Sequence, residues 1–559
     1  MSRQSAPLIT LFLLLGTASL AQSPALVNQT LIDGYYIPHA SRLEVGADGS
    51  AYVLGSAYED QHSLDVILNK VGPDGGHVWE LYINGGNHDY AEDIQLDADG
   101  NIWVCGWTDS PDFPLVDPLD ADFVHREAFL MKVDAQDGSL LYSTFLGGDY
   151  TDRATAMALG QDGSIYLAGE TGSTDFPVTA DALQPEPSFP MYFFTDAFVA
   201  RISPAGDQLL YATYFGGTED DYAQGLALDA AGNILLAGHT TAEDFPLVDA
   251  IDEYPKEMFL AKISADGQSQ LFGSYFGGAY DLSTLRAMEA DAAGNIYLAG
   301  FTRAPDFPTT PGTWSPDFIG AINGCYEYFY GYYNCDDFFV CKVSTSGEGV
   351  LWGTFLGGTA VDQAKDMALD DQGNVYLAGY SASLDFPGND SGVGSQIAVA
   401  KLSGDGADLE FTYLQNSGSA NRGNGVAVGP DGGVYFSGTI GVPASIMVCK
   451  LEQRSSLSGA GDLPAGFALA ANYPNPFNPS TTITYRLPQD GEQHPVRLDV
   501  FDVQGRLVRR LVDDRQDGGA HSVVWDGRGR RGGTLSSGVY YYRLQSDGLQ
   551  TTRSMTLLK

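Results

Sequence analysis

A repeated segment constrains the fold of this chain more than any other feature of its sequence. The tripeptide Asp-Phe-Pro occurs five times, and a turn followed by a strand pattern precedes each occurrence. The tripeptides lie at residues 112–114, 175–177, 244–246, 306–308 and 385–387. Asp97–Gly106 is one copy of the turn and strand, and with the looser copies included the pattern occurs seven times.

Each copy continues into a second hairpin, for example residues 128–133 followed by 140–148. Alternating apolar positions separated by glycine-containing turns predict about four strands per copy. Four-stranded units repeated seven times are typical of a β-propeller, in which each unit forms one blade. Residues 26–454 provide about 61 residues per blade, more than the ~40–45 of common propeller repeats, so we expect long loops.

The two ends of the repeat region predict how the ring closes. The seventh copy ends near Leu451 without a fourth strand, and residues 455–466 have the composition of a linker. Leu26–Gly34 aligns position by position with the outer strand Leu140–Gly148. Because an open sheet edge invites aggregation, we expect the N-terminal strand to complete the last blade.

The turn Asp-x-x-Gly-Asn, the tripeptide Asp-Phe-Pro and the segment Gly216–Ala223 recur in one order over residues 26–454. In these motifs the chain resembles the bacterial seven-bladed β-propeller repeat family. That family is known chiefly by its fold, so the resemblance implies a propeller but supplies no reaction and no catalytic residues.

The composition changes at about residue 464. After this point 12 basic residues stand against 9 acidic ones, a net charge of +3, whereas the preceding residues carry −45. A charge step of this size marks a domain boundary. Short alternating strand patterns in the last segment predict a small antiparallel β-sandwich.

Four motifs in this last segment occur in a distinctive order: Asn472–Pro479, Val500–Gly505, Trp525–Gly527 and Ser537–Tyr541. In these motifs residues 464–559 closely resemble the type IX secretion C-terminal sorting domain, which has an Ig-like fold. The resemblance implies recognition by the type IX secretion machinery, followed by release or attachment at the outer-membrane surface of a Gram-negative bacterium.

The N-terminus has the pattern of a secretory signal peptide. Arg3 precedes the apolar run Leu8–Leu15, and Ala21 ends a small-residue cleavage site. The apolar run is shorter than the about 20 residues of a membrane-spanning helix, so we expect no transmembrane span. The expected organisation is a signal peptide at 1–21, a propeller at 22–454, a linker at 455–466 and an Ig-like sorting domain at 467–559.

Charge and cysteine usage narrow the expected partners and compartment. Acidic residues outnumber basic ones by 71 to 29, and the net charge of −42 repels phosphate, so nucleic acid is not an expected partner. Cys325 and Cys335 flank a loop and are the expected disulfide of an exported protein. Cys105, Cys341 and Cys449 lie in apolar strand patterns, where we expect free, buried thiols.

Aspartates that follow the Gly-Gly pairs form a candidate metal site. If the strand that begins there is the innermost one, these carboxylates ring one mouth of the channel and could hold a cation such as calcium. The alternative is that each aspartate accepts backbone N–H bonds and fixes its own loop. The aspartates are Asp89, Asp152, Asp221, Asp281 and Asp362.

One basic residue also recurs in every copy. Its simplest role is an ion pair with a neighbouring carboxylate while its stem packs between blades. The residues are Lys70, Lys132, Arg201, Lys262, Lys342, Lys401 and Lys450. The acidic turn Asp97–Asn101 has part of the spacing of a calcium loop but lacks the later glutamate, so turn chemistry explains it better.

An insertion in the fifth copy breaks the repeat and carries the candidate ligand-binding residues. Six of the nine residues between the two cysteines are aromatic. Tyrosine combines a flat apolar ring with a polar tip, which suits sugar rings or protein surfaces, and long loops are often functional. The alternative is a lid that folds its rings onto the propeller face. The candidates are Trp314, Tyr326, Tyr328, Tyr330, Tyr332 and Tyr333.

The sequence contains no Gly-x-Ser-x-Gly elbow and no His-Glu-x-x-His motif. We therefore expect a secreted or cell-surface monomer without a cofactor, acting as a non-catalytic binding or adhesion module for an extracellular glycan or protein. An extracellular hydrolase or lyase acting on polysaccharide at the propeller mouth is the alternative, and a structural coat component is the third. Carboxylates about 5–10 Å apart beside an aromatic cleft would favour the enzyme. Aspartates tied to loop amides would favour the binding module.

Overall fold

In the computed structural model every helix or strand among the described residues is a β-strand. The structure describes residues 24–32, 36–58, 63–188, 194–278, 282–291, 293–322, 324–327, 331–346, 349–389, 393–415, 422–440, 445–452, 468–469, 480–487, 493–502, 506–530, 533–536, 538–546 and 549–557. The expected signal peptide and linker lie outside them. The chain divides into two compact units, residues 1–453 and 454–559.

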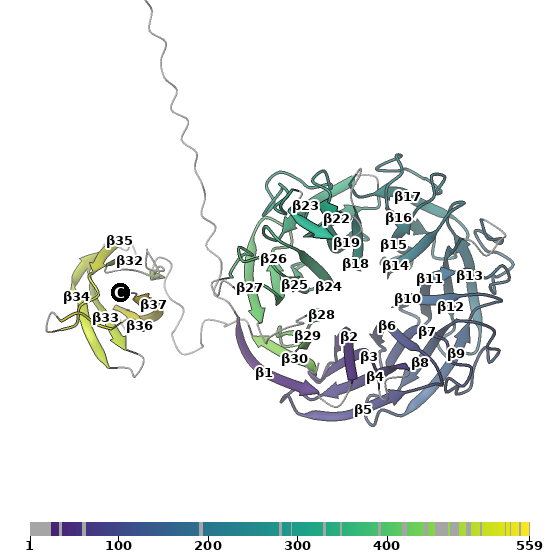
Figure 1. Ribbon diagram of the computed structural model, residues 1–559, viewed down its shortest axis with the longest axis horizontal. Coiled ribbons are helices and arrows are strands. Elements are labelled where there is room, and N and C mark those ends of the chain that lie inside the picture. The colour runs from purple at the N-terminus through teal and green to yellow at the C-terminus, as the bar shows by residue number, and fades with distance from the viewer. Residues whose placement is uncertain are drawn as a thin grey trace, which may run out of the picture. The chain divides into compact units, whose positions relative to one another are not determined.

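Seven four-stranded antiparallel sheets are present in the described part of the first unit, arranged in a ring around a common centre (Figure 1). The innermost strands are β2 (Tyr36–Val45), β6 (Asp89–Leu96), β10 (Asp152–Leu159), β14 (Asp221–Leu228), β18 (Ser283–Ala290), β24 (Asp362–Leu369) and β28 (Arg422–Val428). The second strands are β3 (Ala51–Tyr58), β7 (Ile102–Thr108), β11 (Ile165–Thr171), β15 (Ile234–Thr240), β19 (Ile296–Thr302), β25 (Val375–Ser381) and β29 (Val434–Ile440).

The third and outer strands of each sheet follow the second strand in chain order, except that the outer strand of the last sheet is the N-terminal strand β1. The third strands are β4 (Leu64–Val71), β8 (Glu127–Val133), β12 (Asp196–Ile202), β16 (Met258–Ile263), β22 (Asp337–Ser344), β26 (Gln396–Leu402) and β30 (Ser445–Glu452). The outer strands are β5 (His77–Ile83), β9 (Leu140–Leu146), β13 (Leu209–Phe215), β17 (Gln270–Phe276), β23 (Gly349–Leu356), β27 (Leu409–Gln415) and β1 (Ala25–Ile32).

The hydrophobic core lies between neighbouring sheets. Second strands such as β7 are buried at every residue, because each face of the sheet packs against an adjacent sheet. Leu68 of the first sheet and Val104 and Phe129 of the second belong to one such core. Innermost strands such as β10 alternate instead between buried and half-buried residues, since one face borders the channel.

The Asp-Phe-Pro motif joins consecutive sheets. Its phenylalanine is buried, and in the first four copies it packs on a phenylalanine of the third strand of the same sheet, as Phe245 does on Phe259 with ring centroids 4.6 Å apart. Its aspartate accepts a bond from the loop that connects the preceding sheet to the motif's own sheet, as Asp244 Oδ1 does from Thr218 N at 2.8 Å. The motif therefore has a structural role in the sheets that contain it.

The recurring basic residue pairs with the acidic turn, as its periodicity predicts. Lys132 Nζ lies 2.8 Å from Asp97 Oδ2, and Lys262 Nζ lies 2.9 Å from Asp229 Oδ2. Asp97 Oδ1 also accepts the backbone N–H of Asn101 at 2.8 Å, and Gly100 has a φ of +84°. The acidic segment is therefore a turn rather than a metal loop.

The N-terminal strand belongs to the last sheet. β1 pairs antiparallel with β30, so that Leu26 lies opposite Leu451 and Ile32 opposite Ile446. In Figure 1 the purple strand β1 lies beside the green strands β29 and β30. Leu43 of the first sheet and Val448 of the last share one buried core.

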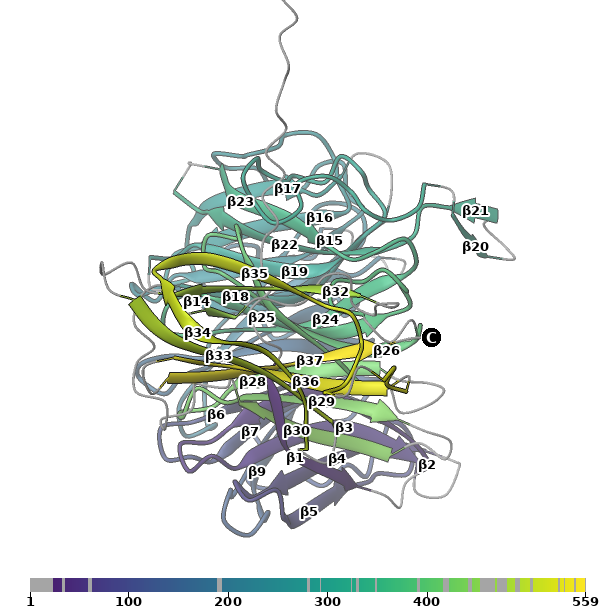
Figure 2. The same cartoon turned by 90° about the vertical axis from the view of Figure 1, so that its left-hand side faces the viewer.

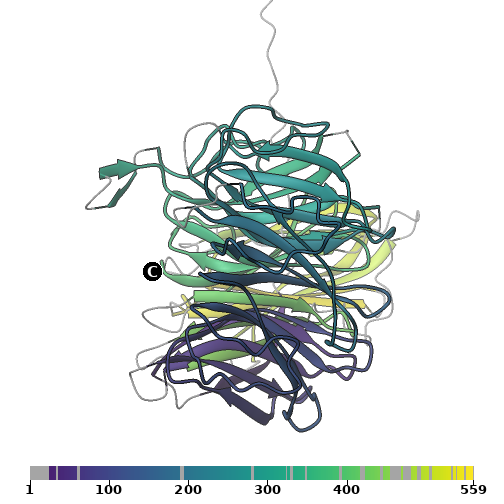
Figure 3. The same ribbon diagram turned by 90° about the vertical axis from the view of Figure 1, so that its right-hand side faces the viewer.

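The insertion in the fifth sheet forms a short hairpin of β20 (Cys325–Glu327) and β21 (Gly331–Tyr333). Figures 2 and 3 show this hairpin projecting from the body of the first unit. Cys325 and Cys335 form the expected disulfide, with 5.2 Å between their Cα atoms. The three remaining cysteines are free and buried, as their strand positions predict.

The second unit contains two antiparallel sheets around one core that includes Trp525 and Tyr542. One sheet has the order β31 (Ala468–Leu469), β32 (Thr481–Leu487) and β35 (Gly519–Trp525). The other has the order β34 (Leu507–Asp517), β33 (Gln493–Asp502), β36 (Gly538–Ser546) and β37 (Leu549–Leu557). Neither unit contains, in its described residues, a helix long and apolar enough to cross a membrane.

Candidate functional site

The aspartates predicted to ring the channel mouth are buried inside their own sheets. Asp89, Asp152, Asp221 and Asp362 begin innermost strands, and each is 0% exposed. The side chain of each accepts the N–H of a preceding glycine, as Asp221 Oδ2 does from Gly217 at 2.7 Å. Their carboxylates are therefore occupied by loop amides, which is the alternative that the sequence left open.

The metal assignment of these aspartates stays a prediction, and their contacts favour the loop-fixing alternative. Among the described residues no group of three or more acidic, histidine or cysteine side chains is arranged to hold a metal ion. Asp281 lies outside the described residues, and the position equivalent to Asp221 is held by Ser283. Ser283 pairs with Thr302 in the ladder, as Asp221 pairs with Thr240.

A second acidic side chain, from the third strand of the preceding sheet, approaches several of these aspartates. A Cβ atom on Gly147 would lie 2.0 Å from Glu127 Oε2 and 2.6 Å from Asp152 Oδ2, so only glycine leaves room for the two carboxyl groups. Burial raises the pKa of Glu127 to about 7, and the charge of Asp152 adds to this shift. Burial likewise raises the pKa of Asp152 to about 6.

The same pairing of acidic groups recurs in two further sheets. Burial raises the pKa of Asp221 to about 7, with a contribution from Asp196. Burial also raises the pKa of Asp337 to about 7, with a contribution from Asp362. Burial is the largest cause of each of these raised pKa values, because it disfavours the charged carboxylate.

The candidate aromatic residues divide into two sets. Trp314 is half-buried, packs against the core shared by the fifth and sixth sheets, and donates its backbone N–H to Gly406 O at 2.8 Å. Its ring therefore contributes to packing, and its role as a ligand-binding residue stays a prediction. The backbones of Tyr326 and Tyr332 pair across the hairpin. The side chains of Tyr326, Tyr332 and Tyr333, and residues 328–330 with Tyr328 and Tyr330, lie outside the described part.

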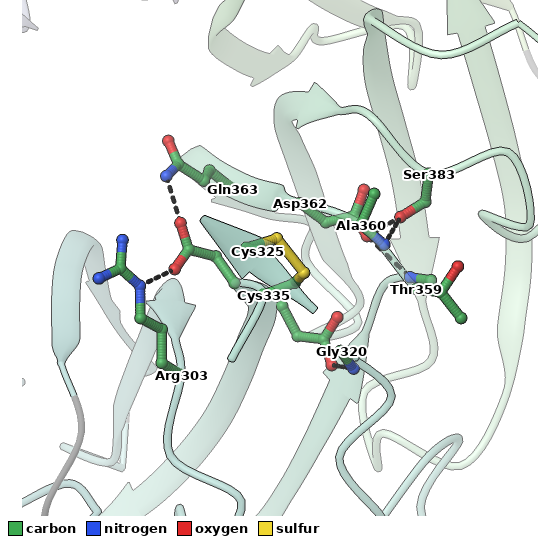
Figure 4. The surroundings of a disulfide bond; sticks show 12 residues. Arg303, Gly320, Cys325, Cys335, Thr359, Ala360, Asp362, Gln363 and Ser383 are labelled. Carbon is green, nitrogen blue, oxygen red and sulfur yellow. Dashed lines mark hydrogen bonds and ion pairs between the residues drawn. A yellow bond between two sulfur atoms is a disulfide. The ribbon is translucent and has the colours of Figure 1, made fainter. Parts of the chain in front are cut away.

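Polar contacts join the base of the hairpin to the channel (Figure 4). Asp336, next to the disulfide, pairs with Arg303 Nε at 2.6 Å and accepts Gln363 Nε2 at 2.6 Å. Gln363 Oε1 in turn accepts Lys365 Nζ at 3.0 Å. Asp336 is 1% exposed, so this chain of contacts fixes Lys365 from beneath the insertion.

The channel itself contains the cavity that borders all seven innermost strands. It has a volume of about 440 Å³. Arg42 crosses it from β2, with Nη1 2.7 Å from Asp366 Oδ1 and Nη2 3.2 Å from the backbone oxygen of Arg286. Arg42 Nε also lies 3.7 Å from Asp93 Oδ1. This guanidinium forms part of the lining of the cavity, which we call the acidic chamber.

Carboxyl groups dominate the acidic chamber. Burial raises the pKa of Glu44 to about 8, and Glu289 adds to the shift. Burial and the charge of Asp366 likewise raise the pKa of Glu289 to about 8. Glu289 is exposed to the chamber, and residues of all seven innermost strands line the chamber around it. Apolar residues such as Leu226 and Met367 form the remaining wall.

The sequence did not identify these channel residues. Position by position, Glu289 stands where other innermost strands have Ala158, Ala227 or Ala368. Such departures from the repeat are the signal that could have found them. A departure from the repeat indicates a channel residue only if its side chain lies on the channel side of the innermost strand. The pairing register of the sheet shows which side that is.

The comparisons with known proteins agree with repeated propeller units followed by an Ig-like domain. Residues 210–246 and 351–387 match the family model of the β-propeller repeat, and residues 475–549 match that of the FlgD Ig-like domain. The chain is 27% identical over 222 residues to the regulatory protein FlaEY of Caulobacter vibrioides. This match covers 37% of the chain and only 22% of FlaEY.

Among solved structures, the chain is similar to the WD40 β-propeller domain of Doa1, with 10% identity, a TM-score of 0.41 and coverage of 76% of this chain and 96% of that one. It is similar to PorZ, a surface component of the type IX secretion system of Porphyromonas gingivalis, with 12% identity, a TM-score of 0.30 and coverage of 97% and 83%. It is similar to a PL25 ulvan lyase, with 11% identity, a TM-score of 0.40 and coverage of 74% and 95%. Similarities this weak carry no information about ligand or activity.

Proposed function

We propose that this chain is a secreted or cell-surface binding protein, built as a closed seven-bladed β-propeller followed by a sorting domain of the type IX secretion system. The seven four-stranded sheets and the pairing of β1 with β30 support the closed ring. The match of residues 475–549 to an Ig-like domain supports the sandwich. The order of motifs in residues 464–559 supports the sorting role.

The proposed domain limits follow the same evidence. A signal peptide occupies residues 1–21, the propeller 22–454, a linker 455–466 and the sorting domain 467–559. The division of the chain at residues 453 and 454 agrees with the proposed start of the linker. The machinery of type IX secretion is therefore the proposed partner of the C-terminal domain.

The proposed activity is non-catalytic binding or adhesion to an extracellular glycan or protein. The observation that carries it is the state of the repeated aspartates, which are buried and bonded to loop amides such as Gly217 N and Gly358 N. Carboxylates used in this way have no access to a polymer. The projecting, disulfide-closed hairpin of β20 and β21, with its tyrosines, is the proposed contact element.

A glycan-array screen tests this proposal. The mature chain, from residue 22 onward, is compared with a Tyr328→Ala/Tyr330→Ala/Tyr332→Ala variant, and both are screened with and without calcium. We expect reproducible binding that the variant loses and that calcium does not change. Shortened glycans would instead indicate a hydrolase or lyase. A folded protein that binds no glycan would refute the glycan ligand.

A further inference from the structure

Three basic side chains of the first unit lack the carboxylate partner that its other lysines and arginines have among the described residues. In the described part of this unit every other lysine and arginine lies within 4.0 Å of a carboxylate. Arg286, Lys365 and Arg422 form no such pair among the described residues. Unpaired cations are unexpected in a chain with a net charge of −42, because acidic partners are abundant.

The three residues come from the innermost strands of three consecutive sheets. Arg286 and Lys365 occupy the same register position in β18 and β24, at a bulge where the ladder shifts. Bulges redirect side chains and are common beside functional sites. The equivalent position in β6 and β10 holds Glu92 and Thr155, so the two cations are specific to this side of the channel.

A single aromatic ring lies beneath two of the cations. The Arg286 guanidinium carbon is 5.5 Å from the centroid of Phe301, and Lys365 Nζ is 5.0 Å from the same centroid. Lys365 is also held by Gln363 Oε1 at 3.0 Å, below the disulfide-closed insertion. Two cations that share one ring are kept close together although they repel each other.

The pKa shifts of Lys365 and Arg286 agree with the close approach of these positive charges. Burial lowers the pKa of Lys365 to about 8, and the charges of Arg286 and Arg422 lower it further. Arg286 is exposed at the channel, yet the protein around it, followed by the charge of Arg42, lowers its pKa. A purely structural role would remove this repulsion with a carboxylate, as at the other basic residues of the unit.

We propose that Arg286, Lys365 and Arg422 form a binding site for an oxyanion, a carboxylate, sulfate or phosphate group of an extracellular ligand. Two guanidinium groups and an ammonium group supply charged donors for such a group, and the planar donor fork of arginine matches its geometry. Arg42 borders the site, because its Nη2 donates to the backbone oxygen of Arg286 at 3.2 Å. This site is separate from the tyrosine hairpin and does not depend on the function proposed for it.

Calorimetric titration of the mature chain tests the site. The probes are sodium sulfate, sodium phosphate and sodium glucuronate, each in a buffer of about 20 mM ionic strength, because salt screens the contacts. We expect saturable binding of at least one anion, and the preferred probe identifies the group. Affinity should fall at least about tenfold in Arg286→Gln/Arg422→Gln, whereas the control Lys256→Gln, at a cation paired with Asp252, should bind as the wild type does.

Thermal unfolding of the same variants separates binding from folding. Since Arg286→Gln/Arg422→Gln removes repulsion, its melting temperature without added anion should equal or exceed that of the wild type. Weakened anion binding together with an unchanged or raised melting temperature supports the site. Absence of saturable binding for all three anions, equal affinity in wild type and variant, or a lowered melting temperature of the variant would each overturn the proposal.

Discussion

Replacing Asp221 by asparagine should stabilise the protein at pH 8. Asp221 is 0% exposed, and its pKa rises from 3.8 to about 7 through burial and the neighbouring carboxyls Asp196 and Asp244. At 1.36 kcal/mol per pKa unit, a shift of about three units corresponds to up to about 4 kcal/mol. Asparagine keeps an oxygen that accepts the Gly217 N–H and carries no charge.

The sign follows from proton linkage. A carboxyl group whose pKa is raised in the folded state binds more protons there than in the unfolded chain, so its contribution to stability is present below about pH 4. That contribution is lost as the pH rises through about 7. Asp221→Asn should therefore unfold at a higher temperature than the wild type at pH 8, and at nearly the same temperature at pH 4.5.

The matched control is Asp229→Asn. Burial opposes ionisation of Asp229, but hydrogen bonds from Asn233 and Lys262 outweigh it and lower the pKa. Its charge should therefore stabilise the fold at pH 8, and the substitution should lower the melting temperature there. Circular dichroism at the two pH values measures both variants. A fall in stability of Asp221→Asn at pH 8 would refute the assignment of a raised pKa.

Three further results are expected. Phe245→Ala should lower the unfolding free energy, measured with urea, by about 3–5 kcal/mol, because it empties a buried site packed on Phe259; a loss below about 1 kcal/mol would contradict this packing. EDTA should leave the melting temperature unchanged, since loop amides occupy the repeated aspartates, and a clear fall would restore a metal site. Deleting residues 24–32 should expose β30 and cause aggregation in size-exclusion chromatography, and a monodisperse product would contradict ring closure by β1.

The repeat made much of the fold predictable from sequence. Alternating positions and glycine turns mark each strand locally, and the buried Phe245 and its counterparts recur with the same spacing. The alignment of Leu26–Gly34 with the outer strand Leu140–Gly148 predicted the pairing of β1 with β30, because both segments carry the same order of residue types. The pairing of Lys132 with Asp97 was likewise predictable from their shared periodicity.

The channel was not predictable in the same way. Arg42 crosses to sheets far away in the chain, and no local pattern reveals that its partner is Asp366. Asp281 was chosen for its distance from the Gly-Gly pair, whereas the ladder places Ser283, two residues later, at the position equivalent to Asp221. The sequence also could not show that the aspartates are buried rather than exposed at a channel mouth.

Binding without cleavage is the central claim, and one experiment tests it most directly. A polysaccharide that binds the mature chain is incubated with it, and both the bound fraction and the polysaccharide length are measured by size-exclusion chromatography. The account predicts a bound polysaccharide of unchanged length, with binding lost in Tyr328→Ala/Tyr330→Ala/Tyr332→Ala. Progressive shortening by the wild type would contradict the account and identify the protein as a hydrolase or lyase.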